Sequence, residues 1–151
     1  MGIVMGNTAK PPIYWQTEWV LKPVSRGFHL ITPALHEQLR QAPVIHTGLV
    51  HLFLKHTSAS LAISENTCTD VPMDLETHLN RLVPDDNQLY RHTLEGEDDM
   101  PAHIKNALLG ASLTLPVCEG RLMLGQWQGI FLAEHRNAAP ARRLVITVHG
   151  I

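Results

Sequence analysis

The sequence predicts an α+β fold in which an antiparallel sheet system carries a few helices. Segments with the alternation and composition of β-strands outnumber segments with helical spacing, and most follow one another through short turns. The chain has 151 residues, of which 44% are hydrophobic and 17% charged, so it has the size and composition of one globular domain. Glycines and prolines without periodicity open the sequence. We therefore expect a flexible arm over residues 1–14 and a single domain over residues 15–151.

Several segments are predicted to be β-strands. Residues 16–22 and 27–32 suit strands joined by a turn at 25–27, which would form an opening hairpin. Residues 47–56 (TGLVHLFLKH) have at least one apolar face throughout and are predicted as a central strand, and residues 61–63 continue in extended form. The remaining strands are expected at 113–117, 127–133 and 143–148, with turns at 119–120 and 124–125.

Three segments have helical character. The first is expected over residues 32–41, where Thr-Pro has the order of a helix start. The second is expected over residues 70–83, where leucines recur at steps of four and three on one face. The third is expected over residues 101–109, opened by a proline and ended by a glycine. The polar segment 85–99 is too long for a tight turn and is predicted to be a functional or disordered loop.

Charge and composition exclude several classes of partner. The formal net charge is −2 and the basic residues are scattered, so nothing indicates a surface for nucleic acid or an anionic membrane. No apolar run approaches the ~20 residues that span a bilayer, and the N-terminus lacks the pattern of an export signal. Cys68 and Cys118 form no CxxC pair, which favours a reducing compartment, and Cys118 is expected to be buried. We expect a cytoplasmic protein.

The ten histidines direct the search for chemistry, because imidazole titrates near neutral pH and is the commonest metal ligand. His92 and His103 flank the acidic segment 95–99 (EGEDD), and His103 lies in the first turn of the third predicted helix. Such a segment can hold a divalent ion on its carboxylates and a phosphate at the helix N-terminus, as expected of Mg²⁺ with a diphosphate. The alternative is that Asp98 and Asp99 only cap the helix.

His56, Thr57 and Ser58 follow a strongly apolar strand, and strand ends commonly present site residues. His56 is predicted to be a third metal ligand or a general base, with a structural role as the alternative. Three imidazoles are a common zinc set, although the spacing of His56, His92 and His103 matches no zinc pattern. We therefore predict that folding brings these three histidines together.

Other chemically capable residues have ordinary alternatives. A reactive thiolate needs a cationic setting, whereas Cys68 has acidic neighbours, so a packing role is favoured. Trp127, between two glycines, is expected in the core or at a subunit interface rather than under a substrate. Arg142 and Arg143 can bind phosphate bidentately, although exposed arginines at a strand start are usually only solvated.

Several blocks of the sequence match one known family. They are SRGFH from Ser25, HTSASL from His56, EN from Glu65, EGEDDMPAHIK from Glu95, LLGASLTLPV from Leu108 and GQWQGIFLAEHR from Gly125. At these residues, which cover nearly everything after Trp15, the chain resembles the YjbQ-like family, also described as secondary thiamine-phosphate synthases. The resemblance implies an antiparallel β-sandwich-like core with about three helices, assembled as a homotrimer with pockets near subunit boundaries.

The same resemblance, taken with the motifs above, indicates where site residues are expected. Metal ligands for Mg²⁺ or Zn²⁺ are expected among His56, His92, Glu95, Asp98 and His103. Catalytic roles are expected for His56, Ser58, Asn66, Asp74 and His103, and phosphate binding for His103, Lys105, Arg142 and Arg143; Asp99 and Glu134 also match. Cys68 stands where relatives are expected to have an aspartate, which puts a metal ligand beside Asn66 in question.

The leading hypothesis for the function, implied by the resemblance, is a weak transferase of the thiamine-phosphate-synthase type. It would couple a hydroxymethylpyrimidine diphosphate to a thiazole phosphate and release diphosphate. Acidic residues and a divalent ion would hold the diphosphate while histidines position it or move protons. Two alternatives stay open: a trimer that binds metal or small anions without turnover, and a metal-assisted phosphate-ester hydrolase. The expected partners are a small phosphorylated molecule and further copies of the chain.

Overall fold

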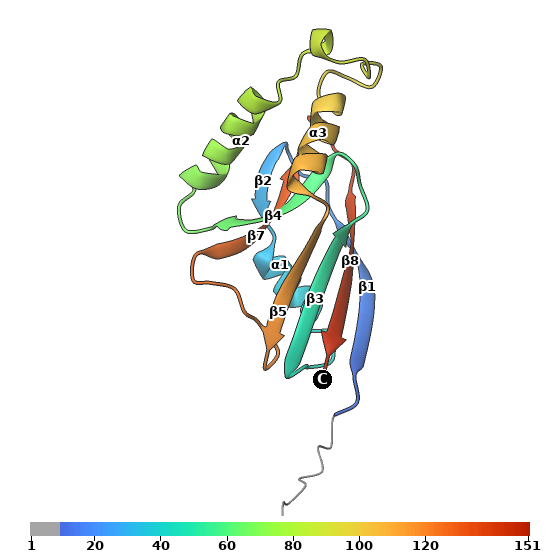
Figure 1. Cartoon of the computed structure of the whole chain (residues 1–151), viewed down its shortest axis with the longest axis vertical. Coiled ribbons are helices and arrows are strands. Elements are labelled where there is room, and N and C mark those ends of the chain that lie inside the picture. Colours follow the sequence, from blue (N-terminus) through green and yellow to red (C-terminus); the bar gives the residue numbers. More distant parts are fainter. Residues whose placement is uncertain (1–9) are drawn as a thin grey trace, which may run out of the picture.

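A computed structural model describes residues 10–151 and contains two antiparallel β-sheets (Figure 1). The larger sheet has the order β1-β8-β3-β5-β6, and the smaller has the order β2-β7-β4. The strands of the larger sheet are β1 (Ile13–Leu21), β3 (Thr47–Leu54), β5 (Ser112–Cys118), β6 (Arg121–Leu122) and β8 (Arg142–Gly150). Those of the smaller sheet are β2 (Gly27–Leu30), β4 (Ala59–Glu65) and β7 (Gln128–Glu134). The predicted α+β class is confirmed.

The two sheets share one hydrophobic core. Side chains alternate between the two faces of a strand, so every second residue of β3, β5 and β8 points toward the smaller sheet. Every second residue of β4 and β7 meets them from the other side. The core residues on these strands are Val50, Leu52, Leu54, Leu115, Val117, Leu144, Ile146 and Val148 from the larger sheet and Ala59, Leu61, Ile130 and Leu132 from the smaller. This arrangement is the expected β-sandwich-like core.

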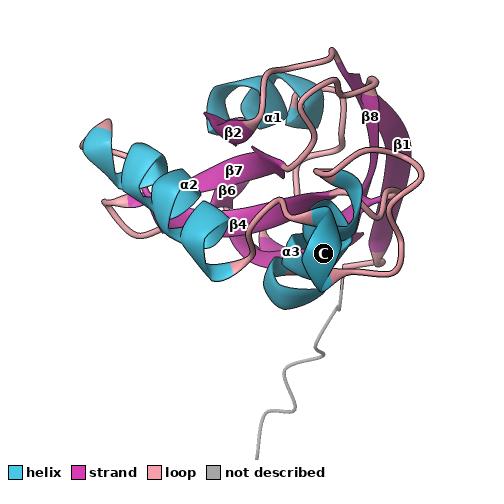
Figure 2. Ribbon diagram, turned by 90° about the horizontal axis from the view of Figure 1, so that it is seen from above, coloured by secondary structure: helices cyan, strands magenta, loops and turns pink. Residues whose placement is uncertain are grey.

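The three predicted helices are present as α1 (Thr32–Leu39), α2 (Asp70–Leu82) and α3 (Asp99–Leu109), with a short 3-10 helix, η1 (Asn87–Leu89), between the last two. Helix α1 places Leu35 in the core. Helix α3 packs on β4 and α2 packs against β2, so both lie by the smaller sheet (Figure 2). Strand β7 lies between β2 and β4 and is buried from Gly129 to Glu134, which explains its continuous apolar sequence.

The predicted opening hairpin is wrong. Strand β1 pairs with β8 in the larger sheet, whereas β2 pairs with β7 in the smaller one. The linking segment directs the chain from one sheet to the other, and the Arg26 side chain within it reaches Asp85 and Asn80 instead of closing a turn. Two consecutive segments can therefore both have the residue pattern of β-strands and still pair with different strands.

Strand β1 overlaps the last residues of the predicted N-terminal arm. Residues 1–9 of the predicted arm lie outside the described residues, and β1 already begins at Ile13. Within residues 10–151, no helix has the length and apolar character needed to cross a membrane. The N-terminus of α3 rises above the ends of β3 and β7 (Figure 1), and of the predicted site residues His92, Asp99 and His103 come together there.

Candidate metal site

Two histidines and one aspartate converge at the start of α3. His92 comes from the loop after η1, Asp99 from the first turn of α3, and His103 from one turn further along the same face. The Nε2 atoms of His92 and His103 lie 2.6 and 3.1 Å from the same oxygen, Oδ2 of Asp99. The three potential ligand atoms lie within 4.8 Å of one another. We call these three residues the His–Asp cluster.

The orientation of His103 leaves its Nε2 atom facing the Asp99 carboxylate. Its Nδ1 lies 2.7 Å from the main-chain carbonyl oxygen of Thr57, which can only accept, so Nδ1 carries the proton. In the neutral ring, Nε2 then directs a lone pair at the Asp99 carboxylate. Two acceptors facing each other repel unless a proton or a metal ion lies between them. A carbonyl on one ring nitrogen and a metal on the other is the usual arrangement of metal-bound histidine.

The second oxygen of Asp99 is also in use, because Oδ1 accepts a hydrogen bond from Arg136. Burial raises the pKa of the Asp99 carboxyl, but the hydrogen bond from His92, the charge of His103 when its ring is protonated, and the charge of Arg136 outweigh burial, so its pKa lies below its ordinary value. Asp99 is therefore an anion at neutral pH. Its side chain is 2% exposed, whereas that of His92 is 46% exposed, so the cluster is closed on the protein side and open toward solvent.

Two imidazole nitrogens and one carboxylate oxygen, with one side open, can hold a transition metal ion. Catalytic zinc sites have three protein ligands of this kind and keep a fourth position for water or substrate. A site of this type can polarise a phosphoryl oxygen or supply a bound hydroxide near neutral pH.

Asp98, predicted to be a metal ligand, is held elsewhere. Its Oδ2 accepts hydrogen bonds from Nε of Arg136 at 3.0 Å and from the main-chain N–H of Asn137 at 2.8 Å. At the N-cap of α3 its side chain makes no capping hydrogen bond within the described residues, so the capping alternative is not supported either. Burial raises the pKa of Asp98, but these two hydrogen bonds outweigh it and lower the pKa. Asp98 fixes the loop after β7 to α3.

Gly96 makes this fixed carboxylate possible. It has a φ of +113°, in the left-handed region that favours glycine, and a Cβ placed there would lie 2.9 Å from Oδ1 of Asp98. The adjacent Glu95, also predicted to be a ligand, has a side chain that is 67% exposed and lies 3.9 Å from Nε2 of His92. Glu95 thus lies at the open rim of the His–Asp cluster.

His56 does not join the cluster. Its Nε2 accepts the main-chain N–H of Arg143 at 2.8 Å, which turns the ring toward β8 and leaves no lone pair on Nε2 for a metal. Burial, with the charge of Arg142 next, lowers the pKa of His56. Here the contact with α3 is made by the backbone that follows β3. The carbonyl oxygen of His56 accepts a hydrogen bond from Asn106, and that of Thr57 accepts one from His103. The predicted convergence therefore holds for two of the three histidines.

Arg142 and Ser58, predicted to contact substrate, belong to a buried ion pair. Arg142 donates two hydrogen bonds of 2.6 Å to the carboxylate of Glu134 and one of 3.0 Å to the hydroxyl oxygen of Ser58. Arg142 is 2% exposed and Glu134 is completely buried. Neither Arg142 nor Ser58 can reach a phosphate, because both lie inside the protein and their polar atoms are already paired.

Lys105, predicted to bind phosphate, is also internal. It is completely buried and its Nζ donates to Oδ1 of Asn80 at 2.7 Å, an oxygen that also accepts from Arg26. Burial lowers the pKa of Lys105. Asp85 in turn forms an ion pair with Arg26, so the charge of Arg26 is compensated by a neighbouring carboxylate. Lys105, Asn80 and Arg26 therefore join α3 and α2 to the segment before β2 rather than forming a phosphate site.

His135 completes the buried polar region beneath α3. Its Nε2 lies 2.9 Å from the hydroxyl of Ser60 on β4, and its Nδ1 has no hydrogen-bond partner among residues 10–151. Burial, with the nearby charges of Lys105, Arg26 and Arg142, lowers the pKa of His135 to about 3. The ring is therefore neutral throughout the physiological range.

Asn66 and Asp74 lie away from the cluster. Asn66 follows the far end of β4, roughly 25 Å from Ser58 at ~3.3 Å per strand residue, and donates to the carbonyl oxygen of Gln128. Asp74 is exposed on α2. Arg143 is the predicted phosphate residue that stays exposed, and it pairs with Glu18.

Both cysteines are free and exposed, so the predicted burial of Cys118 is wrong. Cys118 follows Val117 on β5, and strand alternation places the two side chains on opposite faces. The packing role favoured for Cys68 is not supported either. Trp127 is 55% exposed and does not lie in the core, which leaves the predicted subunit interface as its expected place.

Arg136 is the main site residue that sequence reasoning missed. It bridges Asp98 and Asp99, and its guanidinium also donates to the main-chain oxygen of Glu95. Its only signal was its position as the last residue of the block that starts at Gly125. A buried carboxylate needs a charged partner, and the loop after β7 supplies it.

A two-sheet α+β core with three helices and a His–Asp cluster at the start of the third helix defines a small protein with a candidate metal site. The chain belongs to the UPF0047 family, described as YjbQ-like, whose model matches residues 16–151. The resemblance drawn from the sequence is therefore confirmed.

Curated relatives and solved structures agree with this assignment. The chain is 49% identical to the UPF0047 protein YjbQ of Salmonella typhimurium over 138 residues, which is 91% of this chain and 99% of that protein. A conserved hypothetical protein from Thermus thermophilus is 37% identical, with a TM-score of 0.74 over 87% of this chain and 97% of that one. A YbjQ-like protein from Sulfolobus solfataricus, at 21% identity and a TM-score of 0.83, shares the fold over 93% of this chain and 100% of its own.

Proposed function

We propose that the protein is a metal-dependent enzyme that acts on a small phosphorylated molecule, with His92, Asp99 and His103 as the metal ligands. The observation that carries this proposal is the approach of two imidazole nitrogens to one carboxylate oxygen, at 2.6 and 3.1 Å. The hydrogen bond from His103 to Thr57 supports it, because it turns the unprotonated nitrogen toward Asp99.

The donor set favours Zn²⁺ or a similar transition metal ion. Imidazole suits zinc, whereas Mg²⁺ prefers six oxygen ligands in a near-ideal octahedron. The His–Asp cluster offers two nitrogens and one oxygen. Of the two ions expected from the sequence, Zn²⁺ is therefore the one we propose.

The reaction we propose is the coupling of a hydroxymethylpyrimidine diphosphate to a thiazole phosphate, as the family resemblance implies. The thiazole nitrogen would attack the pyrimidine methylene carbon, the C–O bond to the diphosphate would break, and diphosphate would leave. A metal ion at the cluster would neutralise the charge of the leaving group. The rim carboxylate Glu95 lies 3.9 Å from Nε2 of His92, where it would meet a substrate bound at the open side of the cluster.

The test is an assay of purified protein after chelation and after reloading with Zn²⁺ or Mg²⁺. Both thiamine precursors are supplied, and diphosphate release and the coupled product are measured. Wild type and His78→Ala, a control histidine exposed on α2, should turn over when reloaded, and Asp99→Asn should lose at least a hundredfold in rate. Coupling at equal rates in chelated protein or in Asp99→Asn would contradict the proposal.

A metal-assisted phosphate-ester hydrolase is the second candidate. It is favoured by the open side of the cluster at His92, where a metal-bound water would fit. The same assay without the thiazole phosphate separates the two candidates, because a hydrolase releases phosphate from an ester alone. Metal binding without release of either product would instead indicate a binding protein without turnover.

We propose in addition that the chain assembles as a homotrimer. On α2, Leu75 and Leu79 are partly buried, but Met73 is 66% exposed and Leu82 is 61% exposed. Trp127 is 55% exposed at the opposite end of β4 from the cluster. A second copy would cover these surfaces. Light scattering at micromolar concentration tests this, and a stable monomer would contradict it.

A further inference from the structure

A cavity lies toward the other end of the larger sheet from the His–Asp cluster. It has a volume of about 580 Å³, within the range of small-molecule sites. Its floor is formed by Val50 of β3, Val117 of β5 and Val148 of β8, which belong to the shared core. Strand β3 contributes Val50 to this cavity and ends at Leu54, shortly before Thr57, whose carbonyl oxygen contacts His103 of the cluster, and no residue lines both places. The two sites are therefore separate.

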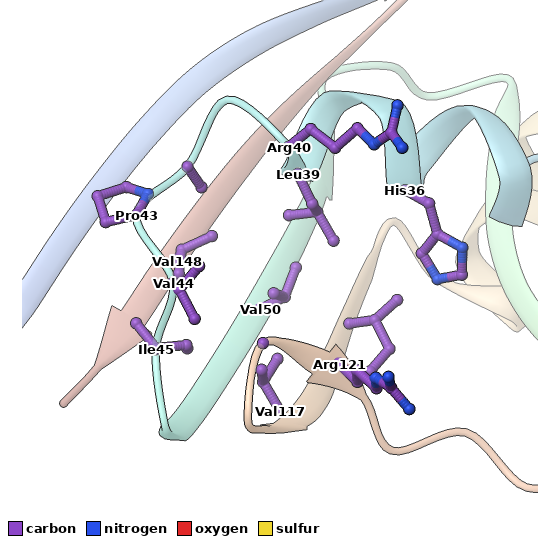
Figure 3. A pocket seen from close by; sticks show the side chains of 13 residues that line it. His36, Leu39, Arg40, Pro43, Val44, Ile45, Val50, Val117, Arg121 and Val148 are labelled. Carbon is purple, nitrogen blue, oxygen red and sulfur yellow. The ribbon is translucent and has the colours of Figure 1, made fainter.

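The walls of the cavity are also largely apolar. Leu39 and Ala42 come from the end of α1 and the segment after it, Ile45 from the loop to β3, and Leu122 from β6. Figure 3 shows these elements around an apolar floor. The hairpin turn between β5 and β6 closes one edge, and Gly120 in that turn has a φ of +73°. An apolar ligand would contact apolar side chains on several sides of this cavity.

Every charged or titratable side chain that lines this cavity is basic. His36, Arg40 and Arg121 are lining residues, and none of the lining residues, all within 10–151, is acidic. In Figure 3 the heads of these three side chains lie on the side of the cavity away from Pro43, Val44 and Ile45. The cavity therefore combines an apolar half with a cationic half.

These basic groups are available to a ligand. Arg121 makes no ion pair within the described residues, and its neighbour Glu119 pairs with His46. Arg40 pairs with Glu37, but both side chains are strongly exposed, and such pairs are weak. An anion entering the cavity would meet at least one unpaired guanidinium, which can bind carboxylate or phosphate bidentately.

We propose that this cavity binds a small amphipathic anion, an apolar chain or ring system that bears one carboxylate or phosphate group. The apolar part would lie on Val50, Val117 and Val148, and the anionic group would lie between Arg121 and His36. This site has its own ligand and does not depend on the metal chemistry proposed for the His–Asp cluster.

Calorimetric titration of the full chain with four probes of equal chain length tests the proposal. Octanoate and octyl phosphate carry the two anionic groups, 1-octanol is uncharged, and octyltrimethylammonium is cationic. At least one anion should bind about tenfold or more tightly than octanol, as expected for one charge-assisted hydrogen bond, and the two anions show which head group is preferred. Hexanoate should bind about fifteenfold more weakly than octanoate, because each buried CH₂ contributes about fourfold.

Two variants locate the binding. Arg121→Gln should reduce the affinity of the preferred anion to that of octanol, and Arg81→Gln, a matched exposed arginine on α2, should leave it unchanged. Ala42→Trp should fill the cavity and abolish binding. If the tryptophan variant does not fold, Arg121→Gln still decides, because Arg121 is exposed and its replacement should leave the fold intact. The proposal is overturned if no probe binds, if octanol or the cation binds as tightly as the anions, or if Arg121→Gln binds like wild type. It is equally overturned if no probe binds and Ala42→Trp changes the molecular mass in solution. In that case the cavity is occupied by a second copy of the chain.

Discussion

The Nδ1 atom of His103 donates a hydrogen bond of 2.7 Å to the main-chain carbonyl oxygen of Thr57. This bond joins α3 to the segment between β3 and β4, and it sets which nitrogen of His103 faces Asp99. The orientation of a proposed metal ligand thus depends on a strand end that is distant in sequence. It also means that the ring is positioned before any metal binds.

Removing this imidazole should weaken metal binding while leaving the fold nearly intact. We expect His103→Ala to lose roughly 1.5–3 kcal/mol of Zn²⁺ binding, about ten- to a hundredfold in affinity, because one of three ligands is absent. The side chain is 30% exposed, so the thermal midpoint should change little. Calorimetric titration with Zn²⁺ beside thermal melting measures both, and His78→Ala is the control. Equal affinity in His103→Ala and wild type would exclude His103 as a ligand.

Asp98→Asn and Asp99→Asn should have different effects, although the residues are adjacent. Asp99 faces the two histidines, so its amide should lose Zn²⁺ affinity. Asp98 holds Arg136 and the N–H of Asn137, so its amide should keep Zn²⁺ affinity and lose about 1–3 kcal/mol of stability. The sequence placed Asp98 among the expected metal ligands, whereas in the structure its Oδ2 is bound by Arg136 and Asn137. Urea unfolding and zinc titration of both variants decide; a weaker zinc site in Asp98→Asn at unchanged stability would make Asp98 a ligand, as the sequence predicted.

The buried pair of Glu134 and Arg142 should be the most sensitive polar contact in the fold. Glu134→Gln leaves Arg142, which is 2% exposed, without its counter-charge, and breaking such a pair costs about 3–5 kcal/mol. The double variant Glu134→Gln with Arg142→Met removes both charges and should be less destabilised than the sum of the single variants. Urea unfolding of the four proteins gives the coupling energy. Additive effects would mean that the pair contributes little beyond its packing.

His135 should make the fold sensitive to acid. Its pKa is about 3 in the folded protein, against 6.5 ordinarily, so between these values the unfolded chain binds the extra proton and stability falls as pH falls. Relative to His135→Gln, wild type should lose up to about 1.4 kcal/mol per pH unit below 6.5. Urea unfolding at pH 7, 5.5 and 4.5 measures this while staying above the range in which Asp98 and Asp99 titrate. Parallel stability curves for the two proteins would show that His135 does not titrate differently in the two states.

Lys105→Met should leave diphosphate binding unchanged, because Lys105 is completely buried. Asn80 keeps its hydrogen bond from Arg26 in this variant, and a buried cation is replaced by an apolar chain of similar length. Stability should therefore change by no more than about 1 kcal/mol in either direction. Titration of the zinc-loaded protein with diphosphate is the measurement, with Arg143→Gln as the comparison. Loss of diphosphate binding in Lys105→Met alone would place Lys105 at the substrate.

Much of the fold could be predicted because local pattern determines it. The leucine spacing of residues 70–83 predicted α2 (Asp70–Leu82) almost residue for residue, and alternation located most strands. Strand pairing could not be predicted, because the partners of β1 and β2 are distant in the sequence and depend on how the two sheets bury their faces.

The site was predictable only in part for the same reason. His92 and His103 stood out beside an acidic segment, but Asp98 and Asp99 look alike in sequence. Which of them faces the histidines depends on Arg136, which arrives from the loop after β7. His56 is turned away by a main-chain N–H of β8. A backbone donor has no signature in a sequence.

The position of β8 in the larger sheet has a consequence for biosynthesis. β8 lies between β1 and β3, with Ile13 opposite Gly150 and Leu21 opposite Arg142. Strand β1, which leaves the ribosome long before β8, therefore waits for β8 before it can pair, and β3 waits for the same partner on that edge. Until then a nascent chain exposes unpaired strand edges, and such contacts between distant segments form slowly. We expect the protein to fold after synthesis of residues 142–150 and to need protection by chaperones before that point.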